Sequence, residues 1–155
     1  MIPTQPLPTQ PVLVPEGLTP YGFSHAGKTA PPEAFDRDSV QRAKKIIRMF
    51  LRPAPNFQPE ITGAKLCRVL SGFLHRCFGE SKYNDLEVGE VILALSQVEG
   101  FQVQAGEDNE GLFNIMVGSV QNLSVVFLPG ITHQEREQYL QTGHFLSQPE
   151  TPVLR

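Results

Sequence analysis

The sequence is poor in cysteine, and its two cysteines are predicted to lie too far apart to bond. Cys67 and Cys77 both fall in one predicted helix. Ten residues at ~1.5 Å of rise place them ~15 Å apart, whereas the Cα atoms of a disulfide are usually ~4 to 7 Å apart. We therefore predict two free thiols.

The sequence also lacks a long apolar run and a secretory start. No stretch approaches the ~18 consecutive apolar residues of a membrane span. The first residues have neither the basic start nor the long apolar core of a signal peptide. We expect a cytoplasmic, or at least intracellular, location and no membrane partner.

No pattern of catalytic or metal-binding side chains is visible in the sequence. Cys67 and His75 stand two turns apart on their predicted helix, and no other Cys/His pair has zinc spacing. His133 and His144 are expected at the surface. Since no nucleophile with a base and no carboxylate pair has a recognisable spacing, we expect no enzyme, no metal and no cofactor.

Charge is distributed unevenly along the 155 residues, although the net charge is only -3. Residues 37–76 carry nine basic and two acidic side chains, a local charge of +7. Residues 80–110 carry one basic and eight acidic side chains, a local charge of -7. The pattern predicts an electrostatic dipole.

Residues 1–35 are rich in proline, which fixes φ and removes a backbone donor, so we predict an extended arm. Two interpretations stay open. The arm is a disordered tail, or it is a docking arm, because its apolar residues exceed what a solvated linker needs. The apolar residues are Ile2, Leu7, Val12, Leu13, Val14, Leu18, Tyr21 and Phe23.

A phosphate-loop pattern, G-x-x-x-x-G-K-T, occurs within this arm at Gly22–Thr29. Such a loop needs a strand before it and a helix after it, and Ala30-Pro31-Pro32 disfavours the helix. We therefore interpret the match as a coincidence, and nucleotide binding is a distant alternative.

Three helices are predicted after the arm, over about 38–52, 60–78 and 84–98, from apolar residues that recur every three or four positions. In the third helix, Asn84 and Glu87 are the expected capping pair and Gly100 the expected C-terminal cap. The first two helices supply a predicted basic face, which we define as Arg42, Lys45, Arg48, Arg52, Lys65 and Arg68.

Alternating residues over 101–105 and 112–117, joined by the charged loop 106–111, predict an antiparallel hairpin. Residues 123–128 are a plausible third strand, and a capping box at Thr132–Glu135 predicts a short helix to about Gln141. The expected fold class is α+β, with three N-terminal helices, then a small hairpin or three-stranded meander, then a short helix. The expected division is an arm at 1–35, one domain at 36–142 and a tail at 143–155.

This order of elements, with Glu99-Gly100-Phe101 between the last helix and the first strand and a wing-like loop at Gly106–Gly111, resembles the winged-helix fold over about 38–117. The resemblance implies that residues 84–98 form a recognition helix and that 106–111 form the wing. In DNA-binding members these elements carry Arg and Lys. Here they carry Asp85, Glu87, Glu90, Glu107, Asp108 and Glu110, and these carboxylates would weaken contact with phosphates.

We therefore expect a non-enzymatic protein-interaction or structural subunit of a larger assembly. It would dock through its N-terminal arm and through this predicted acidic face, Asp85, Glu87, Glu90, Glu107, Asp108 and Glu110. The partners would be proteins, and self-association through the opposite charges is one form. The alternative is a winged-helix nucleic-acid-binding protein that uses the predicted basic face.

Overall fold

The computed structural model describes residues 14–24, 27–79, 84–105, 111–125 and 133–142. In these residues five α-helices dominate: α1 Arg37–Phe50, α2 Gly63–Phe78, α3 Val88–Ser96, α4 Val117–Leu123 and α5 His133–Thr142. Two separate antiparallel pairs of strands accompany them, β1 Leu18–Thr19 with β2 Gly22–Phe23 and β3 Val103–Gln104 with β4 Leu112–Phe113. A 3-10 turn, η1, covers Pro32–Ala34.

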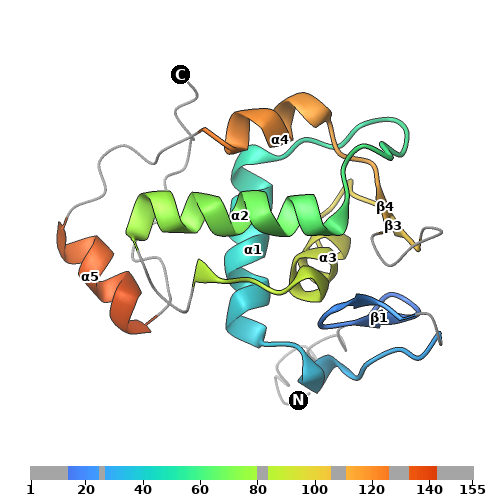
Figure 1. Cartoon of the computed structure of the whole chain (residues 1–155), viewed down its shortest axis with the longest axis horizontal. Helices are drawn as coiled ribbons and strands as arrows, with labels where there is room; N and C mark the ends of the chain where they lie inside the picture. Colours follow the sequence, from blue (N-terminus) through green and yellow to red (C-terminus); the bar gives the residue numbers. More distant parts are fainter. Residues whose placement is uncertain (1–13, 25–26, 80–83, 106–110, 126–132, 143–155) are drawn as a thin grey trace, which may run out of the picture.

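The helices pack across one another around a common core (Figure 1). In this view α2 crosses in front of α1, with α4 above it, α3 below it and α5 at its end. The Phe50 and Phe73 rings join α1 to α2 at 5.1 Å between centroids. The Arg76 side chain donates a hydrogen bond of 2.7 Å to the Leu123 carbonyl and so joins α2 to α4.

Local chemistry sets the ends of the first two helices. Asp36 caps α1, since its Oδ1 accepts from the Asp38 amide at 3.2 Å. Thr62 caps α2 by accepting from the Lys65 amide at 3.1 Å. Prolines 53 and 55 follow α1 and prevent it from continuing, because the residue before a proline is disfavoured in the helical conformation.

The predicted order of elements is wrong, because a β-hairpin comes before the helices. The register of β1 and β2 pairs Leu18 with Phe23 and Thr19 with Gly22. Leu18 is fully buried and Phe23 is 6% exposed, so both belong to the hydrophobic core. The described part of 1–35 is therefore not simply an extended arm, although the division into arm, domain and tail stays a prediction.

The predicted third strand is also wrong where the structure describes it. Of the predicted strand 123–128, Leu123 is the last residue of the helix α4, in which Val120 and Leu123 are buried, and residues 124 and 125 form a turn. Val117, Val120 and Leu123 recur at three-residue steps, which is a helical period. Residues 126–128 lie outside the described part.

Asn114 ties the second hairpin to the helices. Its Oδ1 accepts from the Gln102 amide at 2.5 Å, and its Nδ2 donates to the carbonyls of Ala54 and Gly100 at 3.2 and 3.1 Å. An isolated bridge between Pro53 and Ile115 lies beside it. This buried amide therefore holds together the α1–α2 connection, the α3–β3 connection and β4.

Candidate functional site

The first hairpin covers α3. The Gly89 amide donates a 2.8 Å hydrogen bond to the Pro20 carbonyl, and a Cβ at Gly89 would lie 1.8 Å from the Thr19 carbonyl oxygen. Only glycine allows the two backbones to approach this closely. The hairpin adds to the packing of α1 and α2 against α3, so none of the nine residues of α3 is exposed, and all from Gly89 to Leu95 are buried.

The segment after the hairpin holds the hairpin in place. Thr29 Oγ1 accepts from the Gly17 amide at 2.8 Å, and the Ala30 amide donates to the Leu18 carbonyl at 2.9 Å. The Thr29 hydroxyl oxygen therefore already accepts a hydrogen bond from the Gly17 backbone amide. The chain then continues into η1 and not into a helix whose N-terminus could face a phosphate. These observations agree with the interpretation of Gly22–Thr29 as a coincidence; His25 and Ala26 lie outside the described residues.

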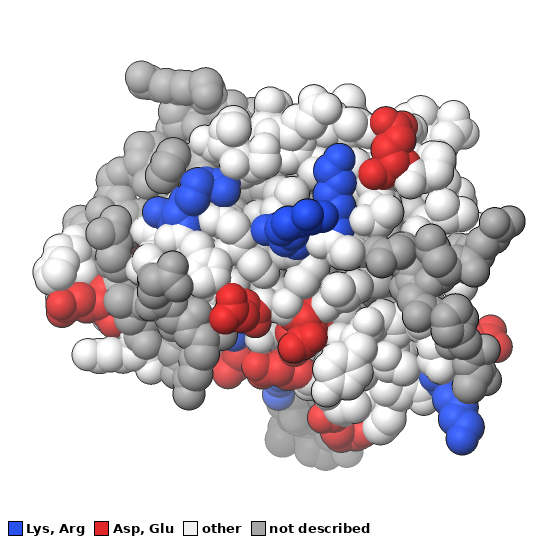
Figure 2. All heavy atoms as spheres, in the orientation of Figure 1, with Lys and Arg blue, Asp and Glu red and all other residues white. Residues whose placement is uncertain are grey.

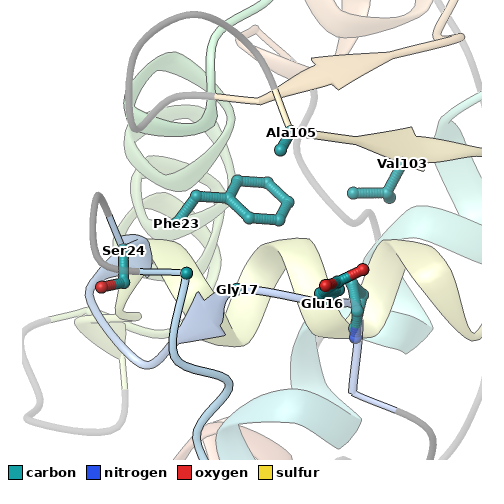
Figure 3. Close-up of a pocket in the computed structure, with 8 residues that line it drawn as sticks. Glu16, Gly17, Phe23, Ser24, Val103 and Ala105 are labelled. Carbon is teal, nitrogen blue, oxygen red and sulfur yellow. The ribbon is translucent and has the colours of Figure 1, made fainter.

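A pocket of about 390 Å³ opens between the first hairpin and β3 (Figure 3). The Phe23 ring points from β2 toward Ala105 and Val103, and the Glu16 carboxylate lies on the Val103 side. A Cβ at Gly111 would lie 2.8 Å from the Phe23 ring, so the two hairpins touch beside this pocket. The lining residues are Pro15, Glu16, Gly17, Phe23, Ser24, Gly27, Val103 and Ala105.

Of the pocket residues, the sequence indicates Phe23 alone, as an apolar residue of the docking arm. A turn signal was present, since Thr19-Pro20-Tyr21-Gly22 has proline and glycine at favoured turn positions between apolar Leu18 and Phe23. Thr19 Oγ1 donates to the Gly22 carbonyl at 2.7 Å and closes this turn. Sequence gives no signal, however, that this hairpin meets β3 some 80 residues later.

Only some residues of the predicted acidic face are exposed to solvent. Asp85 is exposed and its Oδ1 lies 2.9 Å from His75 Nε2, while the exposed Glu87 caps α3. Glu90 is 4% exposed, and its carboxylate accepts from the amides of Glu87 and Asp36 at 2.8 and 3.2 Å. Burial, ahead of the neighbouring carboxylates, raises the pKa of Glu90.

Glu90 therefore joins the start of α3 to the start of α1 and is not offered to a partner. The other three predicted residues of this face, Glu107, Asp108 and Glu110, lie outside the described residues.

The predicted basic face is divided between two helices. Arg42 on α1 is 3% exposed and donates to Ser39 Oγ at 3.0 Å, so it is a buried structural residue. Lys45 and Lys65 are half-buried, and Arg48, Arg52 and Arg68 are exposed. Figure 2 shows basic side chains over α2 and acidic side chains below them, over the segment that leads into α3.

The two cysteines are buried thiols that form no disulfide. The Cys67 thiol donates to the Leu86 carbonyl at 2.8 Å, and burial raises its pKa to about 11. Because a thiolate is the reactive form, this thiol is a poor nucleophile near neutral pH. Within the described ranges, no group of three or more His, Cys, Asp or Glu side chains is placed to hold a metal ion.

No helix in the described part of the chain is both long and apolar enough to span a membrane. Comparison of the chain with protein families, with curated proteins and with solved structures found no match.

Proposed function

We propose that this chain is a non-enzymatic protein-interaction domain that binds an extended segment of a partner protein in the pocket between the first hairpin and β3. The observation that carries this proposal is the pocket itself, which combines the apolar surfaces of Phe23 and Val103 with the carboxylate of Glu16. Such a mixture suits a peptide with an apolar side chain next to a basic one. The domain would act inside the cell, where cysteines without disulfides are ordinary.

The neighbouring strands support an extended ligand over a compact one. β3 pairs with β4 through Val103 and Phe113, and β2 pairs with β1, so two short strands flank the pocket from different sheets. Extended peptides commonly bind beside strands, where alternate side chains enter pockets. Gly17 and Gly27 in the pocket wall lack side chains and leave room for a close backbone approach.

The covered state of α3 argues against DNA reading by this helix. The winged-helix resemblance, which stays a proposal, would make α3 the recognition helix. Side chains must reach base edges to read a sequence. With Gly89 against Thr19 and no exposed residue on α3, the helix has no side chain to offer.

Selection of random peptides displayed on phage, with the full chain as bait, tests the proposal. We expect the selected peptides to share an apolar residue next to a basic one. Val103→Glu should weaken their binding at least tenfold, about 1.4 kcal/mol, because it places a charge in the apolar wall. Glu16→Lys should change the selected basic residue to an acidic one.

The matched control is Gln104→Glu, which adds the same charge one position along β3. Gln104 is exposed and is not among the pocket residues, so its variant should bind within about twofold of the wild type. Selected peptides that bind Val103→Glu as tightly as the wild type would contradict the proposal, as would a selection that enriches nothing.

A further inference from the structure

The solvent-facing side of α1 carries a row of basic residues that the proposed peptide pocket does not use. Arg37, Lys44 and Arg48 are spaced by seven and four residues, which places them on one face of the helix. We call these three residues the α1 basic stripe. The opposite side of α1 is buried, through Val40, Ala43, Ile46, Ile47 and Phe50.

The members of this stripe are held close to one another by the helix. Arg37 and Arg48 are exposed, and Lys44 is half-buried. Burial first, and the nearby Arg48 second, lower the pKa of Lys44. Like charges at this spacing destabilise a helix, so a polyanion that neutralised them would gain that energy on binding.

The stripe has the dimensions of a phosphate row. From Arg37 to Arg48 the helix rises about 17 Å, and one strand of a DNA duplex presents about five phosphates over that length. The exposed large apolar residues in the described part are Tyr21, Met116 and Val125, and none of them lies on α1.

The lack of exposed aromatic residues on the stripe disfavours single-stranded nucleic acid, which binds by base stacking. The same lack disfavours a membrane surface, where a helix inserts large apolar residues.

A second copy of the chain is a poor occupant of the stripe. Of its described carboxylates near α3, Asp85 faces His75, Glu87 caps the helix and Glu90 accepts from the amides of Glu87 and Asp36. That leaves Glu99 as the one remaining exposed carboxylate of this described region to face the three cations of the stripe. We therefore propose that the α1 basic stripe binds the phosphate backbone of duplex DNA without reading its sequence. The stripe lies on α1, so a duplex bound to it would leave the first hairpin in place over α3.

Fluorescence anisotropy with a random-sequence DNA duplex, over a series of salt concentrations, tests this proposal on the full chain. Three phosphate contacts predict that log K falls with log salt at a slope of about -3. The double variant Lys44→Gln/Arg48→Gln should reduce that slope by about 2 and weaken binding roughly 50-fold at 0.1 M salt. Arg37→Gln/Arg48→Gln is a second test pair that should act in the same way.

The matched control is Lys65→Gln/Arg68→Gln on α2, which removes the same charge from a different helix. It should leave the slope within about 0.5 of the wild type, and thermal unfolding would verify that all variants are folded. The proposal is overturned if the wild type does not bind at micromolar concentration, or if the control variant loses as much affinity as the α1 variants. Binding of single strands as tight as that of the duplex, or binding of poly-glutamate in place of DNA, would also overturn it.

Discussion

Gly89 lies directly against the first hairpin, and its replacement by alanine should have the opposite effect to the one that helix propensity predicts. Alanine normally stabilises a helix relative to glycine by up to about 1 kcal/mol. At Gly89, however, the new Cβ would lie 1.8 Å from the Thr19 carbonyl oxygen. Since that neighbour is backbone, the hairpin itself must move.

We expect Gly89→Ala to lower the free energy of unfolding by about 1 to 3 kcal/mol, the usual cost of overpacking. Denaturant unfolding would measure it. Gly118→Ala on α4 is the matched control, because nothing lies within 4 Å of its added Cβ, and it should be neutral or stabilising. A neutral or stabilising Gly89→Ala would mean that the hairpin does not press on α3.

Cys67 should make stability depend on pH above neutrality. Its pKa is about 11 in the folded chain against an ordinary value of 9.0, so the thiol ionises first in the unfolded chain. Its contribution to the free energy of unfolding is therefore full below pH 9 and is lost as the pH rises toward 11. Urea unfolding at several pH values, compared with Cys67→Ala, should show a smaller fall for the variant over this window. Equal falls would show that the Cys67 thiol is not shifted.

At the scale of elements, two carboxylates cap the start of α3, and one of them also reaches α1. Glu90 and Glu87 form a capping box, and Glu90 also accepts from the Asp36 amide next to α1. The side chain therefore stabilises the relative position of two helices as well as the end of one.

Glu90→Ala should lower the free energy of unfolding by about 2 kcal/mol or more, because the amides of Glu87 and Asp36 both lose their acceptor. Glu87→Ala affects the cap alone and should cost about 1 kcal/mol or less. Urea titration of both variants is the measurement. If the two variants lost equal stability, the link from Glu90 to α1 would be without energetic effect.

The helices differ in how closely their observed bounds match the bounds predicted from the sequence. The periodic apolar residues of α1 and α2 predicted their positions to within one to three residues, because each buries a broad stripe. α3 begins at Val88, four residues after the expected start, because Glu87 is its cap and not Asn84. The Asn84 amide oxygen instead accepts from the Tyr139 hydroxyl at 2.7 Å. α4 was interpreted as the end of one strand and the start of another, since Val117 and Leu123 fit either period over so short a run.

At the scale of the whole molecule, contacts distant in sequence decide the candidate site. Phe23 and Val103 line one pocket only because the hairpin packs on α3 and against Gly111. Local patterns do not encode that approach. Charge counts along the sequence were likewise insufficient, because the buried Arg42 and Glu90 contribute to local charge but not to the surface.

Hydrogen exchange at the Gly89 amide tests most directly whether the N-terminal hairpin covers α3. An amide in the first turn of a helix has no partner within that helix and exchanges quickly. Here the Gly89 amide donates to the Pro20 carbonyl at 2.8 Å.

By NMR-detected exchange of the full chain, Gly89 should therefore be protected to a degree comparable with Leu93 in the middle of α3. Exchange of Gly89 at the rate of an unprotected amide, with Leu93 still protected, would show that α3 is formed but uncovered and would contradict the account.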